Sequence, residues 1–164
     1  MQDLPLETIF DVAVDTGGDG FWIEKQGKWY VLHLVQVKAG GKEEAIHCGD
    51  DPEAKSTKTL VSIKYKLLRQ YLNIKRDLRA SKVKYADKLK MGSLTLLSTK
   101  EIKGLDDFRE MEKAKKKTLL TLNGVRDHCK EYEKIPKKRT KTPPLKIISG
   151  PQKLLPLEHS LFYQ

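Results

Sequence analysis

Residues 15–40, DTGGDGFWIEKQGKWYVLHLVQVKAG, are the most informative part of the sequence, because they join a glycine-rich turn to two strand-like segments. Residues 29–37 are rich in aromatic and β-branched side chains, which favour a pleated, half-buried strand. Residues 20–24 form a shorter segment of the same kind. Lys25-Gln26-Gly27 between them predicts a hairpin loop, with glycine at a position that tolerates positive φ.

Polar side chains stand at the end of the longer strand. Gln36 and Lys38 share one face, because side chains alternate along a strand. Such groups are costly to bury without a partner. The turn one hairpin upstream can carry Asp19 to the same edge. Asp19, the Gln36 amide oxygen and a main-chain carbonyl would suit Mg²⁺, and Lys38 would orient or deprotonate an attacking water and offset transition-state charge.

GGDGF at residues 17–21, followed by QVK at 36–38, resembles the PD-(D/E)xK nuclease core in its QxK variant. The nuclease-like C-terminal regions of Crinkler-type effectors and retrotransposon hot spot proteins are similar, and type IV restriction endonucleases have related motifs. The resemblance implies a restriction-endonuclease-like fold and hydrolysis of DNA with Mg²⁺ or Mn²⁺. Asp19, Gln36 and Lys38 would be catalytic, with Asp19 and Gln36 as metal ligands. The family usually adds a glutamate from a preceding helix, a place that Glu7 could take.

Other readings of these residues stay open. Asp15 flanks the same glycines as Asp19 and is a rival metal ligand. The same fold with an incomplete site would be a nucleic-acid-binding or host-targeted effector module without catalysis. A glycine-rich turn and a strand ending in a solvated lysine also occur without any such role. A protein-interaction domain with incidental charge is a third hypothesis.

Composition narrows the class of protein. The length of 164 residues fits one domain, and a formal net charge of +10 favours a polyanionic partner such as nucleic acid. Cys48 and Cys129 are far apart, with no CxxC spacing, which favours a reduced, intracellular setting. No apolar run approaches the roughly 20 residues of a membrane span. We therefore expect no membrane partner. The sequence has no P-loop, GxGxxG, nucleophile elbow or HExxH motif, which disfavours an NTPase, a dinucleotide enzyme, a serine hydrolase or a zinc protease, and we expect no small-molecule cofactor.

Helical periodicity begins after residue 55. Ser56 or Thr57 could cap a helix that runs to about Ser81. Asp50 and Asp51 are expected to begin this helix, where negative charge is favoured, although they could instead bind a metal. Its apolar positions recur every three or four residues, and its opposite face carries a basic outer stripe. The stripe either follows a phosphate backbone or is simply solvated. Its residues are Lys58, Ser62, Lys66, Arg69, Asn73 and Arg76.

The remaining segments complete an α/β fold with a central mixed β-sheet flanked by helices. Strands are expected at 9–14, at 93–99 as the parallel return strand, and at 145–149 as an edge strand. Helices are expected from 100 to 114 and over 119–132, unless Asn123-Gly124 breaks the second.

A basic, proline-rich stretch follows the expected core. We assign 1–133 to the nuclease-like core and 134–164 to a solvent-facing linker and a tail that packs on the core. PKKRTK in this stretch resembles a nuclear localisation signal or a basic arm that binds the phosphate groups of nucleic acid. The expected nucleic-acid contacts are Lys58, Lys66, Arg69, Lys137, Lys138 and Arg139.

Overall fold

A computed structural model describes residues 19–39, 45–55, 58–114, 118–137 and 141–149. Four strands form one mixed sheet in the order β1-β2-β3-β4. β1 is antiparallel to β2, whereas β2, β3 and β4 are parallel. The predicted α/β class with a central mixed sheet is therefore confirmed. The strands are β1 (Gly20–Gln26), β2 (Trp29–Lys38), β3 (Leu89–Ser98) and β4 (Leu145–Ser149).

Several expectations lie outside the described residues. They are the strand at 9–14, the ligand candidates Glu7 and Asp15, the helix caps Ser56 and Thr57, the basic residues Lys138 and Arg139, and the tail at 150–164.

The predicted hairpin is present, with a tighter turn than expected. Gln26 pairs with Trp29, so Lys25 and Gln26 belong to β1 and two residues make the turn. Gly27 has a φ of +59°, a conformation that glycine adopts without steric cost. The pairing continues to Gly20 opposite Val35. This register places Asp19, the residue before β1, beside the end of β2.

β3 begins at Leu89, four residues before the predicted start at 93. The sequence signal was weak there because Gly92 interrupts the apolar pattern. In the fold this glycine leaves room for the His33 ring: a Cβ at residue 92 would come within 2.6 Å of His33 Nδ1. The adjacent Ser93 amide donates to the same nitrogen at 2.9 Å. The register between β2 and β3 shifts at this point.

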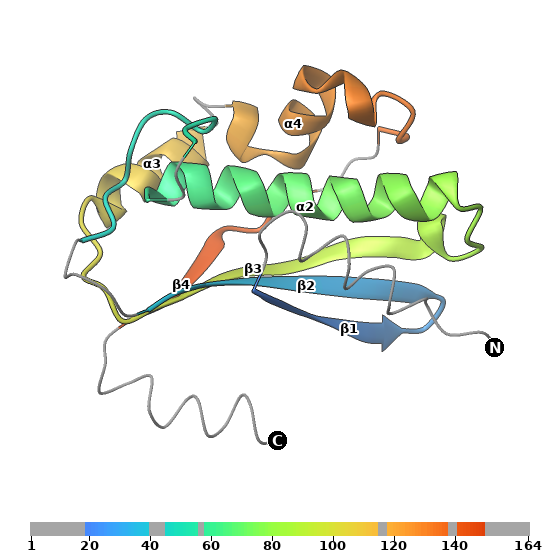
Figure 1. Ribbon diagram of the computed structural model, residues 1–164, viewed down its shortest axis with the longest axis horizontal. Helices are drawn as coiled ribbons and strands as arrows, with labels where there is room; N and C mark the ends of the chain where they lie inside the picture. Colours follow the sequence, from blue (N-terminus) through green and yellow to red (C-terminus); the bar gives the residue numbers. More distant parts are fainter. Residues whose placement is uncertain (1–18, 40–44, 56–57, 115–117, 138–140, 150–164) are drawn as a thin grey trace.

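The long helix α2 (Leu60–Ala80) connects β2 to β3 and packs on the sheet, as predicted (Figure 1). Its N-cap is Thr59, so the expectation that Ser56 or Thr57 caps the helix is wrong. Thr59 Oγ1 accepts from the Ser62 amide at 3.1 Å. Ser62 Oγ in turn accepts from the Thr59 amide at 3.4 Å, which completes a capping box. The expectation that Asp50 and Asp51 begin the helix is wrong, because Asp51 caps a turn instead, accepting from the Glu53 amide at 3.0 Å.

The predicted basic outer stripe of α2 does not face solvent as a whole. Figure 1 shows α2 between the sheet and a layer that contains α4 (Leu122–His128). Ser62 is fully buried and Asn73 is 8% exposed, so the expectation is wrong for these two residues. A helix enclosed on both sides buries polar groups, and these need partners. No buried side-chain polar atom in the described residues lacks one.

The chain after β3 builds the layer above α2. α3 (Leu105–Ala114) is shorter than the predicted 100–114, and the predicted helix at 119–132 is broken into three short pieces. The breaks fall at Thr121 and Cys129 rather than at Gly124, because Thr121 caps α4 by accepting from the Gly124 amide at 3.1 Å. The pieces are η2 (Thr118–Leu120), α4 and η3 (Lys130–Tyr132); η1 (Ala86–Lys88) precedes β3.

The stretch after residue 133 is not a free linker throughout. Ile135 is 4% exposed, and its carbonyl accepts from Arg126 Nε at 2.6 Å. Leu145 at the start of β4 is fully buried. The expectation of a solvent-facing segment is therefore wrong at these two points. None of the helices in the described residues is long and apolar enough to cross a membrane.

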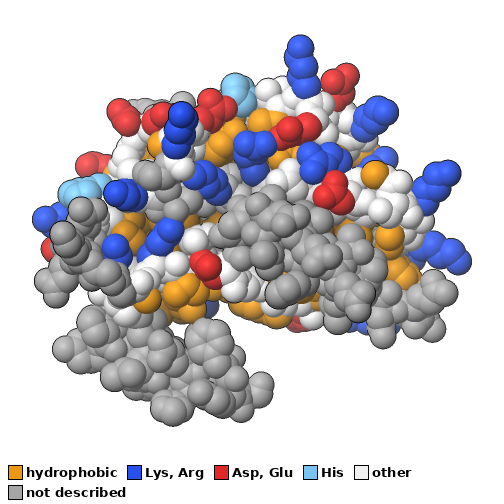
Figure 2. Space-filling model, viewed as in Figure 1, with side chains coloured by type: hydrophobic (Ala, Val, Ile, Leu, Met, Phe, Trp, Pro, Cys, Tyr) orange, Lys and Arg blue, Asp and Glu red, His pale blue; other side chains and the backbone are white. Residues whose placement is uncertain are grey.

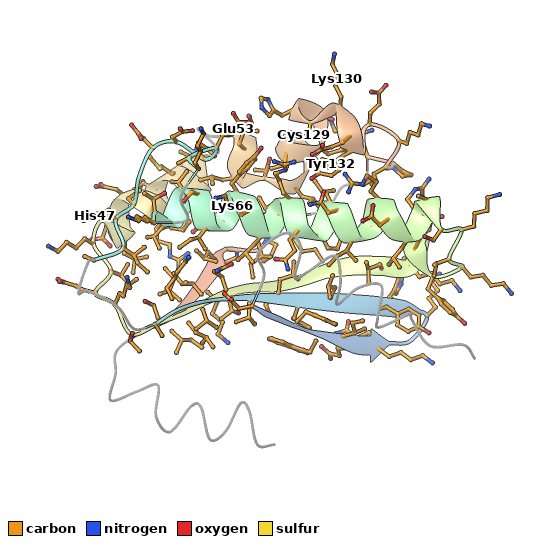
Figure 3. All side chains as sticks on the ribbon, in the orientation of Figure 1. His47, Glu53, Lys66, Cys129, Lys130 and Tyr132 are labelled. Atoms are coloured by element: carbon orange, nitrogen blue, oxygen red, sulfur yellow. The ribbon has the colours of Figure 1, made fainter. Side chains whose placement is uncertain are left out.

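Tyr132 connects the upper layer to α2 by hydrogen bonds, and the contribution of this contact to stability can be tested. Its ring is fully buried, and it lies between α2 and the layer above (Figure 3). Burial raises the pKa of Tyr132 to about 12, so the neutral hydroxyl donates to Asn73 Oδ1 at 2.5 Å and accepts from Arg69 Nε at 3.2 Å. We expect Tyr132→Phe to lower the unfolding free energy by about 1–3 kcal/mol, because a buried acceptor loses its donor. Urea unfolding of both proteins measures this change in unfolding free energy.

The second variant for this test is Tyr132→Phe combined with Asn73→Leu. Replacing both partners by apolar groups removes the unpaired acceptor, so part of the lost stability should return. A change below about 0.5 kcal/mol in the single variant would mean that this hydrogen bond does not hold the layer in place.

Candidate nuclease-like site at the end of β2

Asp19 is fixed against the end of β2 by three hydrogen bonds. Its amide donates to the Val35 carbonyl at 3.2 Å, which extends the β1–β2 pairing by one residue. Its Oδ2 accepts from the Val37 amide at 2.8 Å and from Gln36 Nε2 at 2.7 Å. The glycine-rich turn and the QVK segment therefore meet in space, as the sequence analysis expects.

Gln36 is 8% exposed, and its amide is oriented by Asp19. Because a carboxylate only accepts, the amide nitrogen faces it. Within the described part of the chain, neither Gln36 Oε1 nor Asp19 Oδ1 accepts a hydrogen bond. These are two oxygen atoms of the kinds that Mg²⁺ prefers, and no described residue occupies either of them.

Lys38 lies on the same face of β2 as Gln36 and is half-buried. Burial lowers the pKa of Lys38 below its ordinary value of 10.5, and the negative charge of Asp19 opposes this shift. Lys66 on α2 and Lys100 after β3 lower the pKa further by repulsion between like charges. Among the described residues, the charges that act on Lys38 are therefore two cations and one carboxylate.

Lys100 belongs to this group, although the sequence pattern did not indicate it. The register pairs Lys38 with Ser98, and the Lys100 amide donates to Ser98 Oγ at 2.9 Å. The signal that could have found it was the expected return strand at 93–99. A parallel neighbour of β2 ends at the same edge of the sheet, so the residues just after it approach Lys38.

A divalent cation fits the available donors only in part. Asp19 and Gln36 supply one carboxylate oxygen and one amide oxygen, and Mg²⁺ commonly takes its remaining ligands from water and phosphate. Among the described residues, no three His, Cys, Asp or Glu side chains converge in a metal-binding arrangement. A further carboxylate ligand would have to come from the part of the chain that is not described, where Glu7 and Asp15 lie.

Of the four described lysine and arginine residues expected to contact nucleic acid, Lys66 and Arg69 lie on α2, Lys58 just before it, and Lys137 after η3. Lys58 is exposed, and Lys66 Nζ donates to the Lys55 carbonyl at 3.1 Å. Arg69 is held by Glu131 and Tyr132, and Lys137 pairs with Asp127 at 3.1 Å. Figure 2 shows basic and acidic side chains interspersed on the face in view. Lys66 alone among these four is near the Asp19 group.

A second polar group connects the loop before α2 to α4. Glu53 Oε1 contacts His128 Nε2 at 2.7 Å and accepts from the Tyr65 hydroxyl at 3.3 Å. The Tyr65 hydroxyl also lies 3.8 Å from Cys129 Sγ. Glu53 and Cys129 lie at the boundary between these elements (Figure 3). Both cysteines are free thiols, consistent with the absence of CxxC spacing.

Comparison of the chain with protein-family models, with curated proteins and with solved structures finds no match.

Proposed function

We propose that this chain is a nuclease-like domain that hydrolyses phosphodiester bonds in DNA with a divalent cation. The observation that supports this most is the group at the end of β2. Asp19 is fixed by Gln36 and Val37, and Lys38 lies half-buried on the same face. A restriction-endonuclease-like assignment would agree with the β2-α2-β3 unit and with the helix that covers one side of the sheet.

In this proposal each side chain has a separate task. Asp19 Oδ1 and Gln36 Oε1 would hold Mg²⁺ or Mn²⁺, which supplies Lewis-acid stabilisation of a phosphate oxygen. The Val37 amide and the Gln36 amide nitrogen keep the Asp19 carboxylate in one orientation, so little reorganisation is needed. Lys38 would place a positive charge beside the phosphate as negative charge develops in the transition state. Lys66 and Lys100 would attract the DNA backbone to this edge.

A second candidate function is nucleic-acid binding without catalysis. Among the described residues, one carboxylate, from Asp19, acts on Lys38, while Lys66 and Lys100 add two further positive charges near that lysine. Such a surplus of positive charge binds a phosphate backbone without a metal ion. This function would suit a host-targeted effector module, and the sequence PKKRTK would suit action in the nucleus.

One pair of measurements separates the two functions. We expect the full chain to convert supercoiled plasmid to nicked circles in Mg²⁺ or Mn²⁺ and to leave it intact in EDTA. DNA retention in EDTA is measured alongside, between 50 and 200 mM salt. Binding through about six phosphates would weaken roughly a thousandfold over this range. Retention with no nicking in either metal would support the binding module. If the chain shows no nicking and no salt-dependent retention, both proposals are overturned.

A further inference from the structure

A basic pocket lies away from the Asp19 group, on the side of α2 where α3, α4 and the start of β4 meet. Its volume is about 570 Å³, which lies within the range of small-ligand sites. It shares no lining residue with the group formed by Asp19, Gln36 and Lys38. The lining residues that carry charge are four cations and one carboxylate: Lys64, Arg109, Lys113, Lys141 and Glu112.

A buried ion network forms one wall of the pocket. The Glu112 side chain is 8% exposed and accepts from Lys64 Nζ at 2.5 Å and from Arg109 Nη1 at 2.6 Å. Its Oε2 also accepts from the Leu145 amide at 2.9 Å. Two cations thus share one carboxylate, which leaves one positive charge uncompensated within the network. Burial lowers the pKa of Lys64, as expected where water is scarce, while Glu112 favours its charged form.

Further donors at the pocket have no acceptor among the residues that the structure describes. Lys113 and Lys141 are exposed, and neither pairs with an acid in the described part of the chain. Arg109 uses Nη1 for Glu112, while its Nε and Nη2 find no acceptor among the described residues. Thr142 Oγ1 accepts from the Leu122 amide at 2.8 Å, so its hydroxyl hydrogen can still be donated. Cations and a hydroxyl from α3 and from the segment before β4 therefore line one pocket with unused donor capacity.

We propose that this pocket binds a phosphomonoester group, through Arg109, Lys113 and Lys141. A phosphomonoester carries a charge of about −1.5 to −2 at pH 7 and has three strong acceptor oxygens. The lining has a surplus of three positive charges, and guanidinium and ammonium groups are the usual partners of phosphate. The group could belong to the end of a nucleic-acid strand or to a free nucleotide. The inference does not depend on the proposed nuclease activity.

The test compares ligands that differ only by the phosphate. Adenosine 5′-monophosphate is titrated against adenosine, and a short 5′-phosphorylated oligonucleotide against its 5′-hydroxyl form, by calorimetry in EDTA. We expect the phosphorylated member of at least one pair to bind at least tenfold more tightly. A preference in the oligonucleotide pair alone identifies a strand end, and a preference in the nucleotide pair identifies a free nucleotide. No preference in either pair overturns the proposal.

Two double variants of equal charge locate the binding. Lys113→Gln with Lys141→Gln should remove the preference for the phosphorylated ligand. Lys82→Gln with Lys84→Gln, which removes two exposed lysines from the turn after α2, should keep it. All four lysines are exposed, so both proteins should fold, which circular dichroism confirms. Equal loss of the preference in the two double variants would show a general charge effect and would overturn the assignment to this pocket.

Discussion

Lys38→Met should lower the rate of Mg²⁺-dependent plasmid nicking at least about a hundredfold, with only a small effect on DNA retention. Methionine keeps the length and apolar character of the side chain, so the half-buried position stays filled. The ammonium charge near the phosphate is lost, and that charge matters most as the transition state forms. Retention should change little, because one phosphate contact among several is removed.

Lys100→Met is the matched control for this prediction. Lys100 acts on the same group through its charge, since it lowers the pKa of Lys38, but it lies beyond the end of β3 rather than on the face shared with Gln36. We expect a loss of a few-fold in nicking and a similar loss in retention. Equally large losses of nicking in the two variants would mean that Lys38 contributes only to the overall positive electrostatic field of the site. Undiminished nicking in Lys38→Met would show that Lys38 has no part in the mechanism.

The pH dependence of the nicking rate tests the role of Lys38 independently. Burial lowers its pKa below 10.5, so the protonated form is lost at a lower pH than for an exposed lysine. If the cation stabilises the transition state, the rate should fall as pH rises through this lowered pKa. Lys38→Arg keeps a charge that does not titrate in this range, so whatever activity it retains should lack the alkaline fall. A rate that rises through the same range would instead assign Lys38 as a base.

The parts of this site that could be predicted from the sequence are those set by local geometry. Alternation along one strand places Gln36 and Lys38 on one face, and a hairpin with a short turn fixes which residue of the preceding segment lies opposite them. Asp19 reaches the Val37 amide because β1 pairs with β2 without interruption from Gln26 back to Gly20. Such features depend on a few neighbouring residues, which is why the residue pattern alone was sufficient.

The surroundings of α2 could not be predicted in the same way. A basic stripe on an amphipathic helix normally faces water, but here η2, α4 and η3 return over it. Arg69 and Asn73 meet Tyr132 about sixty residues later in the chain, and Lys64 meets Glu112. No periodicity within residues 60–80 contains that information. Lys100 escaped notice for a related reason, since its position depends on the register between β2 and β3.

Glu112→Ala should be the most destabilising single substitution among those considered, lowering the unfolding free energy by about 3–5 kcal/mol. The substitution leaves Lys64, which is 2% exposed, without its carboxylate, and it leaves the Leu145 amide without its acceptor. Arg109 is affected less, because its side chain is 31% exposed and can turn to water. In a domain of this size the loss corresponds to a fall in melting temperature of roughly 6–20 °C.

A double variant at Glu112 and Lys64 distinguishes the cost of leaving a charge unpaired from the cost of losing the side chain's packing. Glu112→Leu combined with Lys64→Met replaces the ion pair by apolar side chains of similar size, and such replacements are often neutral or stabilising. We therefore expect the double variant to be more stable than Glu112→Ala by about 2 kcal/mol or more, measured by urea unfolding. If the double variant unfolds as easily as the single one, the Leu145 hydrogen bond and the packing of β4 are the important features. If Glu112→Ala costs less than about 1 kcal/mol, water reaches Lys64 and the network is not a buried one.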